Sequence, residues 1–329
     1  MPTLSRLAIL DDYQGVTLAL GPWDRLPPGI GIEVFRDTLT DPDALAAHLA
    51  PFDALLIMRE RKPFPRALLE RLPRLRLLIT TGARNRAVDL AACAERGITV
   101  CGTASVGHPT VDLTWGLILS LMRRIPEQER GLREGRWQVA LGGTLEGRTL
   151  GVVGLGNLGS RVAKVALAFG MEVLAWSRNL TAERAATAGA TRVDKEELLA
   201  RADVVTLHLI LSDRSRGIIG AADLARMKPG AFIVNTSRGP LIDQAALLSA
   251  LHEGRLAGAG LDVYDQEPLP PGHPLLAAPN TVLTPHLGYV TEENYRQHRS
   301  LRAEFCSPKL HGWPQHIENS AFWKVPVAA

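Results

Sequence analysis

A glycine-rich stretch between an apolar strand and a helix places the strongest constraint on the fold of this 329-residue chain. The segment Thr149–Gly170 reads TLGVVGLGNLGSRVAKVALAFG, and its glycines match G-x-G-x-x-G directly after the apolar run Leu150–Val153. Apolar residues after the last glycine of this pattern recur at helical spacing. Such a strand–turn–helix unit is typical of a dinucleotide site, because the helix N-terminus presents unpaired N–H groups to the phosphates.

Each glycine of the turn has its own expected task. Gly154 permits the tight turn, Gly156 lets the backbone approach a pyrophosphate, and Gly159 allows close packing of helix on strand. Glycines that serve packing alone are the alternative, but a second apolar strand at Glu172–Trp176 favours the nucleotide site. The residues expected to bind the cofactor here are Gly154, Gly156, Asn157, Leu158 and Gly159.

The end of the second strand bears on the choice of cofactor. NAD-selective sites usually place Asp or Glu about 20 residues after the turn, where the carboxylate accepts from the ribose 2′-hydroxyl. This chain has Ser177 followed by Arg178 instead. A solvated surface arginine is the alternative reading, but the sequence favours NADP over NAD.

Short apolar runs alternate with helical segments along the chain, which predicts parallel sheets covered by helices. In the first hundred residues we expect strands at Leu7–Leu10, Ile32–Phe35, Ala54–Met58, Leu75–Thr80 and Ile98–Cys101, and helices at Asp41–Leu49, Arg66–Arg71 and Val88–Glu95. Pro109 begins a helix that we expect to continue to about Arg130. Later strands are expected at Leu150–Val153, Glu172–Trp176, Val204–Leu209, Phe232–Asn235, Gly260–Val263 and Thr281–Leu283. The dinucleotide-binding domain is therefore expected at 105–287, inserted between residues 1–104 and 288–329 of a second domain.

Composition excludes several classes of protein. The net charge is only +3, from 37 basic and 34 acidic residues, and the arginines are scattered, so we expect no nucleic-acid partner. We also expect no membrane span, since no apolar run reaches about 18 residues. The three cysteines form no C-x-x-C pair, which is compatible with a reducing cytoplasm, and the histidines show no metal-ligand spacing, so no metal is expected.

Three further segments place polar residues just beyond expected strands. They are Met227–Asp243, Gly260–Pro268 and Thr281–Tyr289, which carry Arg238, Asp262 with Glu267, and His286. Ligands of open parallel sheets bind at the carboxyl ends of the strands, so these residues are candidates for a site. A single arginine, carboxylate or histidine at such a position is more often an ordinary surface or core residue. The hypothesis of a site therefore rests on the four residues occurring together in this order.

Together with the glycine turn, these motifs resemble the D-isomer-specific 2-hydroxyacid dehydrogenase family. The resemblance spans roughly residues 5–295 and rests on N-T-S-R-G at Asn235–Gly239, E-P at Glu267, and P-H-L-G at His286. It implies an α/β fold, with a Rossmann dinucleotide-binding domain inserted in a flavodoxin-like α/β substrate domain. It also implies a small 2-keto or 2-hydroxy acid as substrate, and a homodimer formed through the region Gly107–Trp137.

The resemblance also implies a role for each matching residue. Arg238 would bind the substrate carboxylate as a planar fork, and His286 would be the general acid in ketone reduction. Glu267 would orient the imidazole and stabilise its protonated form, and Asp262 would hold the nicotinamide carboxamide. Further cofactor contacts are expected from His208, Leu209, Ile210, Thr236, Ser237 and Gly288.

The first domain is expected to complete the substrate site through two loops. Arg59 lies in one loop, and Ala83 and Arg84 match the family's carboxylate-binding positions in the other, although Arg84 replaces a common glycine. With Arg61 and Arg86 they would favour a dianionic or phosphorylated substrate. Solvated arginines are an equally open alternative.

The segment Gln297–Ala329 departs from the family pattern, since prolines and tryptophans stand where a long helix is expected. A shifted reading frame and genuine divergence are both open explanations. Two other functions also stay open: a nucleotide-binding regulator or corepressor on the same fold, and an enzyme inactivated by its altered C-terminus.

Overall fold

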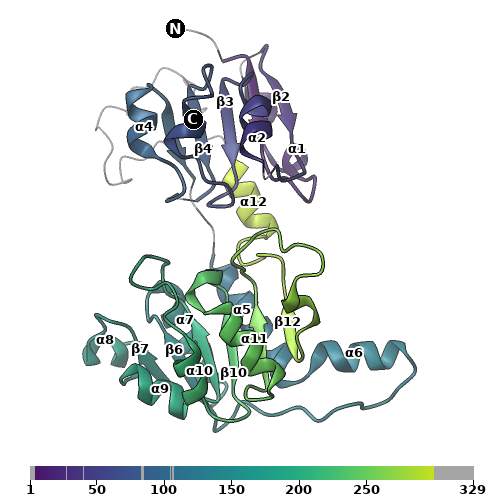
Figure 1. Cartoon of the computed structure of the whole chain (residues 1–329), viewed down its shortest axis with the longest axis vertical. Helices are drawn as coiled ribbons and strands as arrows, with labels where there is room; N and C mark the ends of the chain where they lie inside the picture. Colours follow the sequence, from purple (N-terminus) through teal and green to yellow (C-terminus); the bar gives the residue numbers. More distant parts are fainter. Residues whose placement is uncertain are drawn as a thin grey trace, which may run out of the picture. The chain divides into compact units, whose positions relative to one another are not determined.

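The computed structural model describes residues 4–26, 28–39, 41–82, 85–103, 105 and 107–299. The chain forms two compact units (Figure 1). Unit 1 comprises Met1–Gly107 and Thr291–Ala329, and unit 2 comprises His108–Val290. Unit 2 is therefore an insertion within unit 1. Of the segment Gln297–Ala329, which departs from the family pattern, residues 300–329 lie outside the described residues.

Unit 1 contains a five-stranded parallel sheet. Its strands are β1 (Arg6–Ile9), β2 (Gly31–Val34), β3 (Ala54–Ile57), β4 (Leu77–Thr80) and β5 (Thr99–Gly102). The spatial order β2-β1-β3-β4-β5 is the flavodoxin-like order, in which the direction of winding changes between β1 and β3. The α/β class predicted from the sequence is confirmed.

Helices of unit 1 surround this sheet. They are α1 (Thr17–Leu20), the 3-10 turn η1 (Trp23–Arg25), α2 (Pro42–Leu49), α3 (Arg66–Leu69), α4 (Leu90–Glu95) and α12 (Glu292–Arg299). Apolar residues of α2, α3 and α4 share one buried cluster with the strands. Asp41 and Asp89 cap α2 and α4 by accepting from the backbone N–H three residues on. The buried Tyr295 of α12 donates to Gln14 at 3.0 Å, so the chain after the insertion is tied to this unit.

Unit 2 contains a seven-stranded parallel sheet with the order β12-β11-β10-β9-β6-β7-β8. Its strands are β6 (Thr149–Val153), β7 (Glu172–Trp176), β8 (Thr191–Arg192), β9 (Val204–Leu207), β10 (Phe232–Asn235), β11 (Gly258–Leu261) and β12 (Thr281–Leu283). Every residue of β6, β9 and β11 is buried, as expected for central strands covered on both faces. The winding changes direction between β6 and β9.

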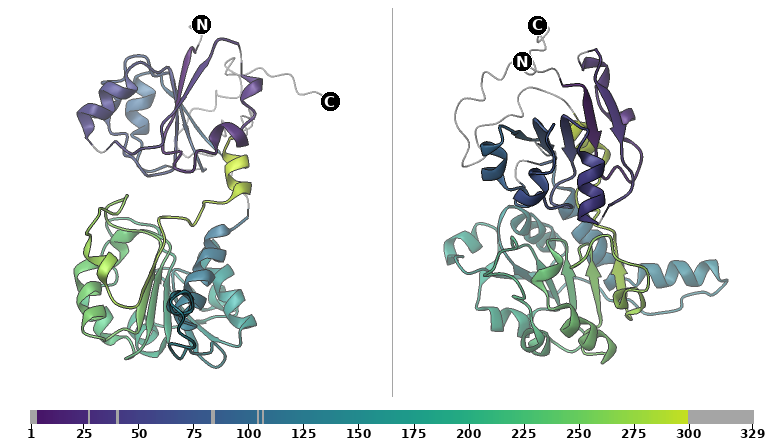
Figure 2. Two further views of the ribbon diagram at one scale, coloured as in Figure 1. Left: turned by 90° about the vertical axis from the view of Figure 1, so that its right-hand side faces the viewer. Right: turned by 45° about the horizontal axis from the view of Figure 1, so that its top comes forward.

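Helices cover both faces of this sheet (Figure 2). They are α5 (Pro109–Met122), α6 (Ile125–Arg133), α7 (Asn157–Ala168), α8 (Ala182–Ala186), α9 (Lys195–Arg201), α10 (Ala221–Arg226) and α11 (Gln244–His252), with short turns η2 (Gly239–Leu241) and η3 (Pro274–Ala277). The two ends of unit 2 meet, since the Thr110 hydroxyl donates to the Gly288 carbonyl at 2.6 Å.

Two local predictions need correction. The helix expected from Pro109 to Arg130 is interrupted after Met122, because Arg124 has a left-handed backbone (φ +53°) and a new helix, α6, begins at Ile125 with Pro126 in its first turn. The strand expected at Gly260–Val263 is β11, Gly258–Leu261, because Phe232 of β10 pairs with Gly258. This shift leaves Asp262 directly beyond the strand end.

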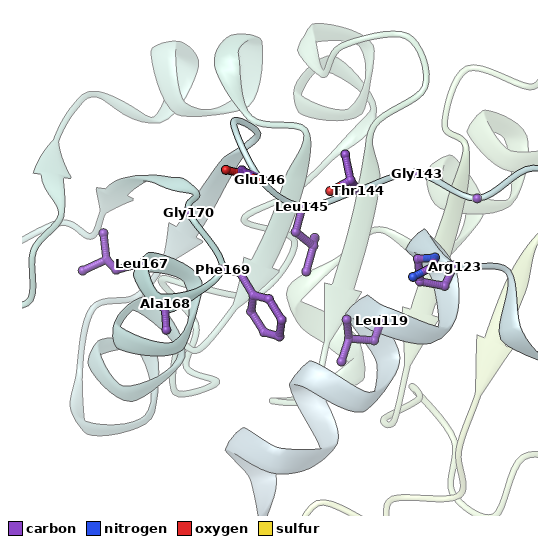
Figure 3. Close-up of a pocket in the computed structure, with 11 residues that line it drawn as sticks. Leu119, Arg123, Gly143, Thr144, Leu145, Glu146, Leu167, Ala168, Phe169 and Gly170 are labelled. Carbon is purple, nitrogen blue, oxygen red and sulfur yellow. The ribbon is translucent and has the colours of Figure 1, made fainter.

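The helix α5 and the end of α7 border a hollow on unit 2 with both polar and apolar lining residues (Figure 3). Its cavity volume is about 870 Å³, and Leu119, Leu145, Leu167 and Phe169 contribute its apolar lining. Nearby, α6 and the segment that follows it extend away from the sheet (Figure 1). That segment carries Trp137, which is 78% exposed. No helix in the described part of the chain is long and apolar enough to cross a membrane.

Candidate active site

The glycine turn lies where unit 2 changes its direction of winding. Gly154 follows β6 with φ +104°, a conformation that side chains rarely adopt, and its N–H donates to the Trp176 carbonyl at 2.8 Å. A Cβ on Gly154 would lie 2.8 Å from the His208 carbonyl, so the turn touches the end of β9. Parallel sheets bind their ligands at this switch point.

The backbone at Gly156 is open in a way that fits a phosphate. Gly156 caps α7, and a Cβ built there would meet no atom within 4 Å. The expected cofactor residues Asn157 and Leu158 lie in the first turn of this twelve-residue helix, where the backbone N–H groups have no partner within the helix and can bind a phosphate. A Cβ on Gly159 would instead collide with the Gly154 carbonyl, so this glycine serves close packing.

A hollow of about 390 Å³ adjoins the turn. Its lining includes the expected cofactor residues Gly154, Gly156, Ser177, Arg178, His208, Leu209 and Ile210. Burial lowers the pKa of His208 to about 4, and its ring Nε2 lies 3.0 Å from the Thr206 hydroxyl. Its Nδ1 is buried without a hydrogen-bond partner among the described residues. The hollow thus has one neutral histidine with an unused polar atom.

The remaining candidates follow three neighbouring strands. Arg238 comes three residues after β10, Asp262 directly after β11, and His286 three residues after β12. Since β10, β11 and β12 are adjacent and parallel, their carboxyl ends lie side by side. The fold therefore brings to one sheet edge residues that are separated by about fifty positions of sequence.

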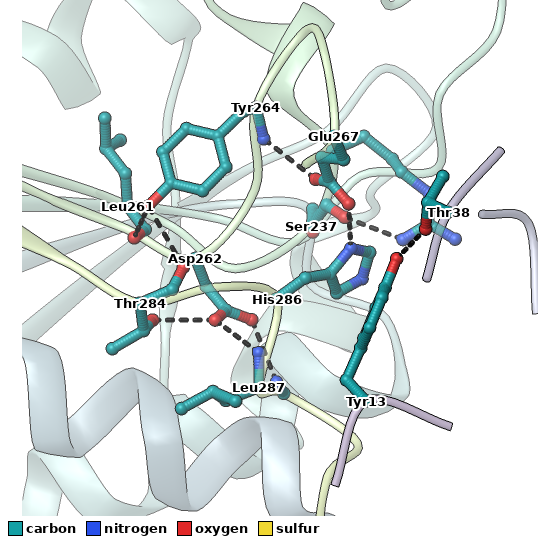
Figure 4. Close-up of polar contacts among 12 residues, drawn as sticks. Tyr13, Thr38, Ser237, Leu261, Asp262, Tyr264, Glu267, Thr284, His286 and Leu287 are labelled. Atoms are coloured by element: carbon teal, nitrogen blue, oxygen red, sulfur yellow. Dashed lines mark hydrogen bonds and ion pairs between the residues drawn. The ribbon is translucent and has the colours of Figure 1, made fainter. Parts of the chain in front are cut away.

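The Glu267 and His286 side chains are in direct contact (Figure 4). Nδ1 of His286 donates to Oε2 of Glu267 at 2.5 Å, since an ionised carboxylate only accepts. The other carboxylate oxygen accepts from the Tyr264 N–H at 2.9 Å, which fixes the Glu267 side chain. With Nδ1 engaged, Nε2 is the ring atom available to give or take a proton.

The backbone of His286 is itself unusual. Its φ is +55°, in the left-handed region that a non-glycine residue seldom occupies. Asp262 braces the segment around it: Oδ1 accepts from the Thr284 hydroxyl at 2.7 Å and the Leu287 N–H at 2.6 Å, and Oδ2 from the Gly288 N–H at 2.9 Å. Burial raises the pKa of the fully buried Asp262 carboxyl, against the effect of these bonds. Asp262 thus positions the loop that carries His286.

The segment after β10 is held by hydrogen bonds of its own. The Asn235 amide donates to the Arg238 carbonyl at 2.9 Å, and the Ser237 hydroxyl donates to the Leu207 carbonyl at the same distance. Thr236 is buried, with its hydroxyl 2.8 Å from that of Thr114. Arg238 donates from its guanidinium to the Ser237 carbonyl at 2.7 Å and is partly exposed.

Unit 1 places one predicted substrate residue at its own sheet edge. Arg59 follows β3 with φ +48°, and its backbone N–H donates to the Thr81 hydroxyl at 3.0 Å. Its guanidinium lies against Gly82, where a Cβ would come within 2.7 Å of Nη1. The predicted residues Ala83 and Arg84 lie outside the described residues.

Several polar residues near these sites were not predicted. In unit 1 these are the buried Lys62, which pairs with the buried Asp11 at 3.1 Å, and Tyr13, whose ring centroid lies 4.6 Å from the guanidinium carbon of the predicted residue Arg61. Arg184 and Arg214 line the hollow beside the glycine turn in unit 2. No local sequence motif marks these unpredicted residues. The one available signal is that some of them lie in loops that follow strands. In the described part of the chain, no three His, Cys, Asp or Glu residues form a metal-binding group.

Comparison with known proteins adds to this geometry. A family model described as "D-isomer specific 2-hydroxyacid dehydrogenase, NAD binding domain" matches residues 115–288. This range falls within unit 2. It includes the glycine turn, Arg238, Glu267 and His286.

Individual relatives match over most of the chain. A glyoxylate reductase from Korarchaeum cryptofilum is 38% identical, covering 87% of this chain and 83% of that protein. A D-3-phosphoglycerate dehydrogenase from Methanocaldococcus jannaschii is also 38% identical, covering 78% of this chain but 50% of the longer relative. The crystal structure of a phosphoglycerate oxidoreductase from Vibrio cholerae matches with a TM-score of 0.85 at 39% identity, covering 90% of this chain and 96% of that one.

Proposed function

Since this chain belongs to the D-isomer specific 2-hydroxyacid dehydrogenase family, we propose that it is an oxidoreductase that transfers a hydride between NAD(P)H and a small 2-keto acid, forming the D-2-hydroxy acid. The observation that carries this proposal is the 2.5 Å contact between Glu267 and His286. It provides a proton donor at the sheet edge that also carries Arg238. A protein that only senses nucleotide needs no such donor.

Each residue of the site has a proposed task in this reaction. Arg238 binds the substrate carboxylate as a bidentate fork and polarises the neighbouring carbonyl. His286 gives the proton at Nε2 to the carbonyl oxygen and takes it back in the reverse direction. Glu267 keeps Nδ1 protonated and stabilises the positive charge of the imidazolium. Bound NAD(P)H supplies the hydride.

Asp262 has a proposed positioning role as well as its expected cofactor contact. Its two oxygens already accept three hydrogen bonds from residues 284–288. We therefore assign to it the placement of His286, with the nicotinamide carboxamide as an additional donor to the same carboxylate. Its neighbours Thr236, Ser237 and Gly288 complete the proposed cofactor contacts.

The proposed cofactor is NADPH in preference to NADH. Two features support this choice: Ser177 stands where an acidic acceptor for the ribose 2′-hydroxyl is usual, and Arg178 stands beside it. Both line the hollow next to the glycine turn. A lower KM for NADPH than for NADH in the same reduction is the expected result.

Arg59 of unit 1 is the proposed further substrate contact, with Ala83 and Arg84 as sequence-based candidates. We also propose a cytoplasmic homodimer. Its proposed contact is the extended α6 segment: the exposed Trp137 and Leu141 would pack against an apolar surface of a second copy, for which the leucines and Phe169 of the hollow in Figure 3 are candidates. Sedimentation of wild type and Trp137→Ala tests the dimer.

The function is tested by following NADPH and NADH oxidation with glyoxylate, hydroxypyruvate, pyruvate and 3-phosphohydroxypyruvate. Turnover of at least one acid, with the D-isomer as product, is expected. Tight NADPH binding without turnover of any 2-keto acid would refute the enzyme and favour a regulator.

A further inference from the structure

Three arginines from three different elements line the hollow beside the glycine turn. Arg178 follows β7, Arg184 lies on α8, and Arg214 lies in the loop between β9 and α10. No aspartate or glutamate is among the described residues that line it. The hollow therefore carries three positive charges at its wall without a carboxylate in that wall.

Among the described residues, these three arginines lack the carboxylate partners that many other arginines of unit 2 have. Arg201 binds both Glu172 and Glu197, and Arg124 binds Glu127, as is usual for surface arginines. The guanidinium groups of the three lining arginines form no hydrogen bond or ion pair with any other described residue. Unpaired cations at a concave, carboxylate-free surface attract an anion.

The loop that carries Arg214 is fixed by its own hydrogen bonds. The buried Ser215 hydroxyl donates to the Ile210 carbonyl at 2.7 Å and accepts from the Ser212 N–H at 2.8 Å. The Arg216 N–H donates to the Ser212 carbonyl at 2.9 Å. Arg214 therefore projects from a turn that is already ordered, which lowers the entropy cost of binding through it.

The rest of the lining identifies the class of ligand. Leu180, Leu209 and Ile210 form an apolar part of the wall, and Ile210 is 68% exposed. An apolar wall suits the faces of a purine ring, whereas the three guanidinium forks suit a phosphate monoester with a charge near −2. One molecule that presents both groups is an adenosine phosphorylated on its ribose.

We propose that Arg178, Arg184 and Arg214 together form the site for the ribose 2′-phosphate of NADPH, and that Arg214 is a specificity-determining residue for the cofactor. This inference rests on the proposed function, because it requires the dinucleotide to bind along the glycine turn. Arg178 contacts the phosphate from the β7 side, as the sequence predicts. Arg184 and Arg214 add two donors that no local motif shows.

The direct test is calorimetric binding of three probes to the full chain: 2′,5′-ADP, 3′,5′-ADP and 5′-AMP. We expect 2′,5′-ADP to bind at least about tenfold more tightly than 5′-AMP, as charge-assisted hydrogen bonds to one phosphate provide. Equal affinity for 2′,5′-ADP and 5′-AMP would overturn the proposal. So would equal affinity for 2′,5′-ADP and 3′,5′-ADP, because the site would then not select the 2′ position.

Variants assign the effect to single residues. Arg214→Gln is expected to lower affinity for 2′,5′-ADP about tenfold while 5′-AMP affinity stays within about twofold, which also shows that the variant is folded. Arg226→Gln, an exposed arginine of α10 outside the hollow, is the matched control and should change neither affinity. An unchanged 2′,5′-ADP affinity in Arg214→Gln would remove Arg214 from the site.

Kinetics separate this proposal from the proposed function. Arg214→Gln should raise the KM for NADPH about tenfold and leave kcat and the KM for NADH near wild type. Reduction of a 2-keto acid with equal KM for NADH and NADPH would refute the 2′-phosphate site alone. Absence of binding by 5′-AMP, NADH and NADPH would instead refute the dinucleotide site and the function with it.

Discussion

Two glycines of the same turn should respond in opposite ways to one added methyl group. In Gly159→Ala the new Cβ would lie closer to the Gly154 carbonyl than real Cβ atoms do, and 3.1 Å from Val152 Cγ1. The obstacle is backbone of the tight turn directly after a buried strand, so it yields little, and the cost is at the upper end of overpacking, about 3 kcal/mol. For a domain of this size that lowers Tm by about 6–12 °C.

Gly156→Ala adds the same methyl group where no atom lies within 4 Å. Its φ of −88° suits alanine, and the loss of glycine at a helix N-cap costs less than about 1 kcal/mol. Its Tm should therefore fall by less than about 4 °C. The methyl group occupies the space through which a pyrophosphate would approach, so NADPH affinity should fall at least about tenfold.

Scanning calorimetry of wild type and both variants measures the first effect, and titration calorimetry with NADPH measures the second. If Gly159→Ala has the same Tm as wild type, the close helix–strand packing at this turn is not as described. If Gly156→Ala binds NADPH as tightly as wild type, the pyrophosphate does not lie over this glycine.

Three further predictions concern the catalytic edge and the hollow. His286→Gln should lower kcat by about 10²–10⁴-fold with either cofactor. Glu267→Gln should lower kcat at least about tenfold, because the imidazole loses the carboxylate that orients it. Steady-state rates within twofold of wild type would contradict both roles. Burial lowers the pKa of His208 from 6.5 to about 4, so the unfolded chain alone takes up this proton as pH falls from 6.5 to 4. Stability should fall over that range by up to about 3 kcal/mol more in wild type than in His208→Asn, as urea unfolding at each pH can measure. Asp262→Asn turns an amide group toward the Gly288 N–H and should cost about 1–3 kcal/mol and reduce kcat, which thermal melts and initial rates would check.

Local patterns predicted those parts of the protein that depend on neighbouring residues. The turn at Gly154 was recognisable because a tight turn, an apolar strand and a helix follow each other within one short segment. Arg238 and His286 could be singled out because strand ends in a parallel sheet share one edge. Their proposed roles stay predictions, while the α/β fold and the family are confirmed.

Features that depend on distant residues could not be predicted in this way. Arg184 and Arg214 look like ordinary surface arginines until three loops converge on one hollow. The bracing role of Asp262 depends on its complete burial, which the sequence does not reveal. The break at Arg124 was missed because Pro126 is compatible with the first turn of a helix as well as with its interruption.

The hydrogen bond between Thr110 and Gly288 has a consequence for how the chain reaches its native state. These residues are 178 positions apart, yet they bring the two ends of unit 2 together. Until Thr110 and Gly288 meet, α12 must find its partners α1 and Gln14 in unit 1 across a very long loop. Once they have met, the same search spans only a short connection. The folded insertion thus holds close together the two chain segments that form unit 1. We expect unit 2 to gain protection from hydrogen exchange before the contact between Tyr295 and Gln14 forms.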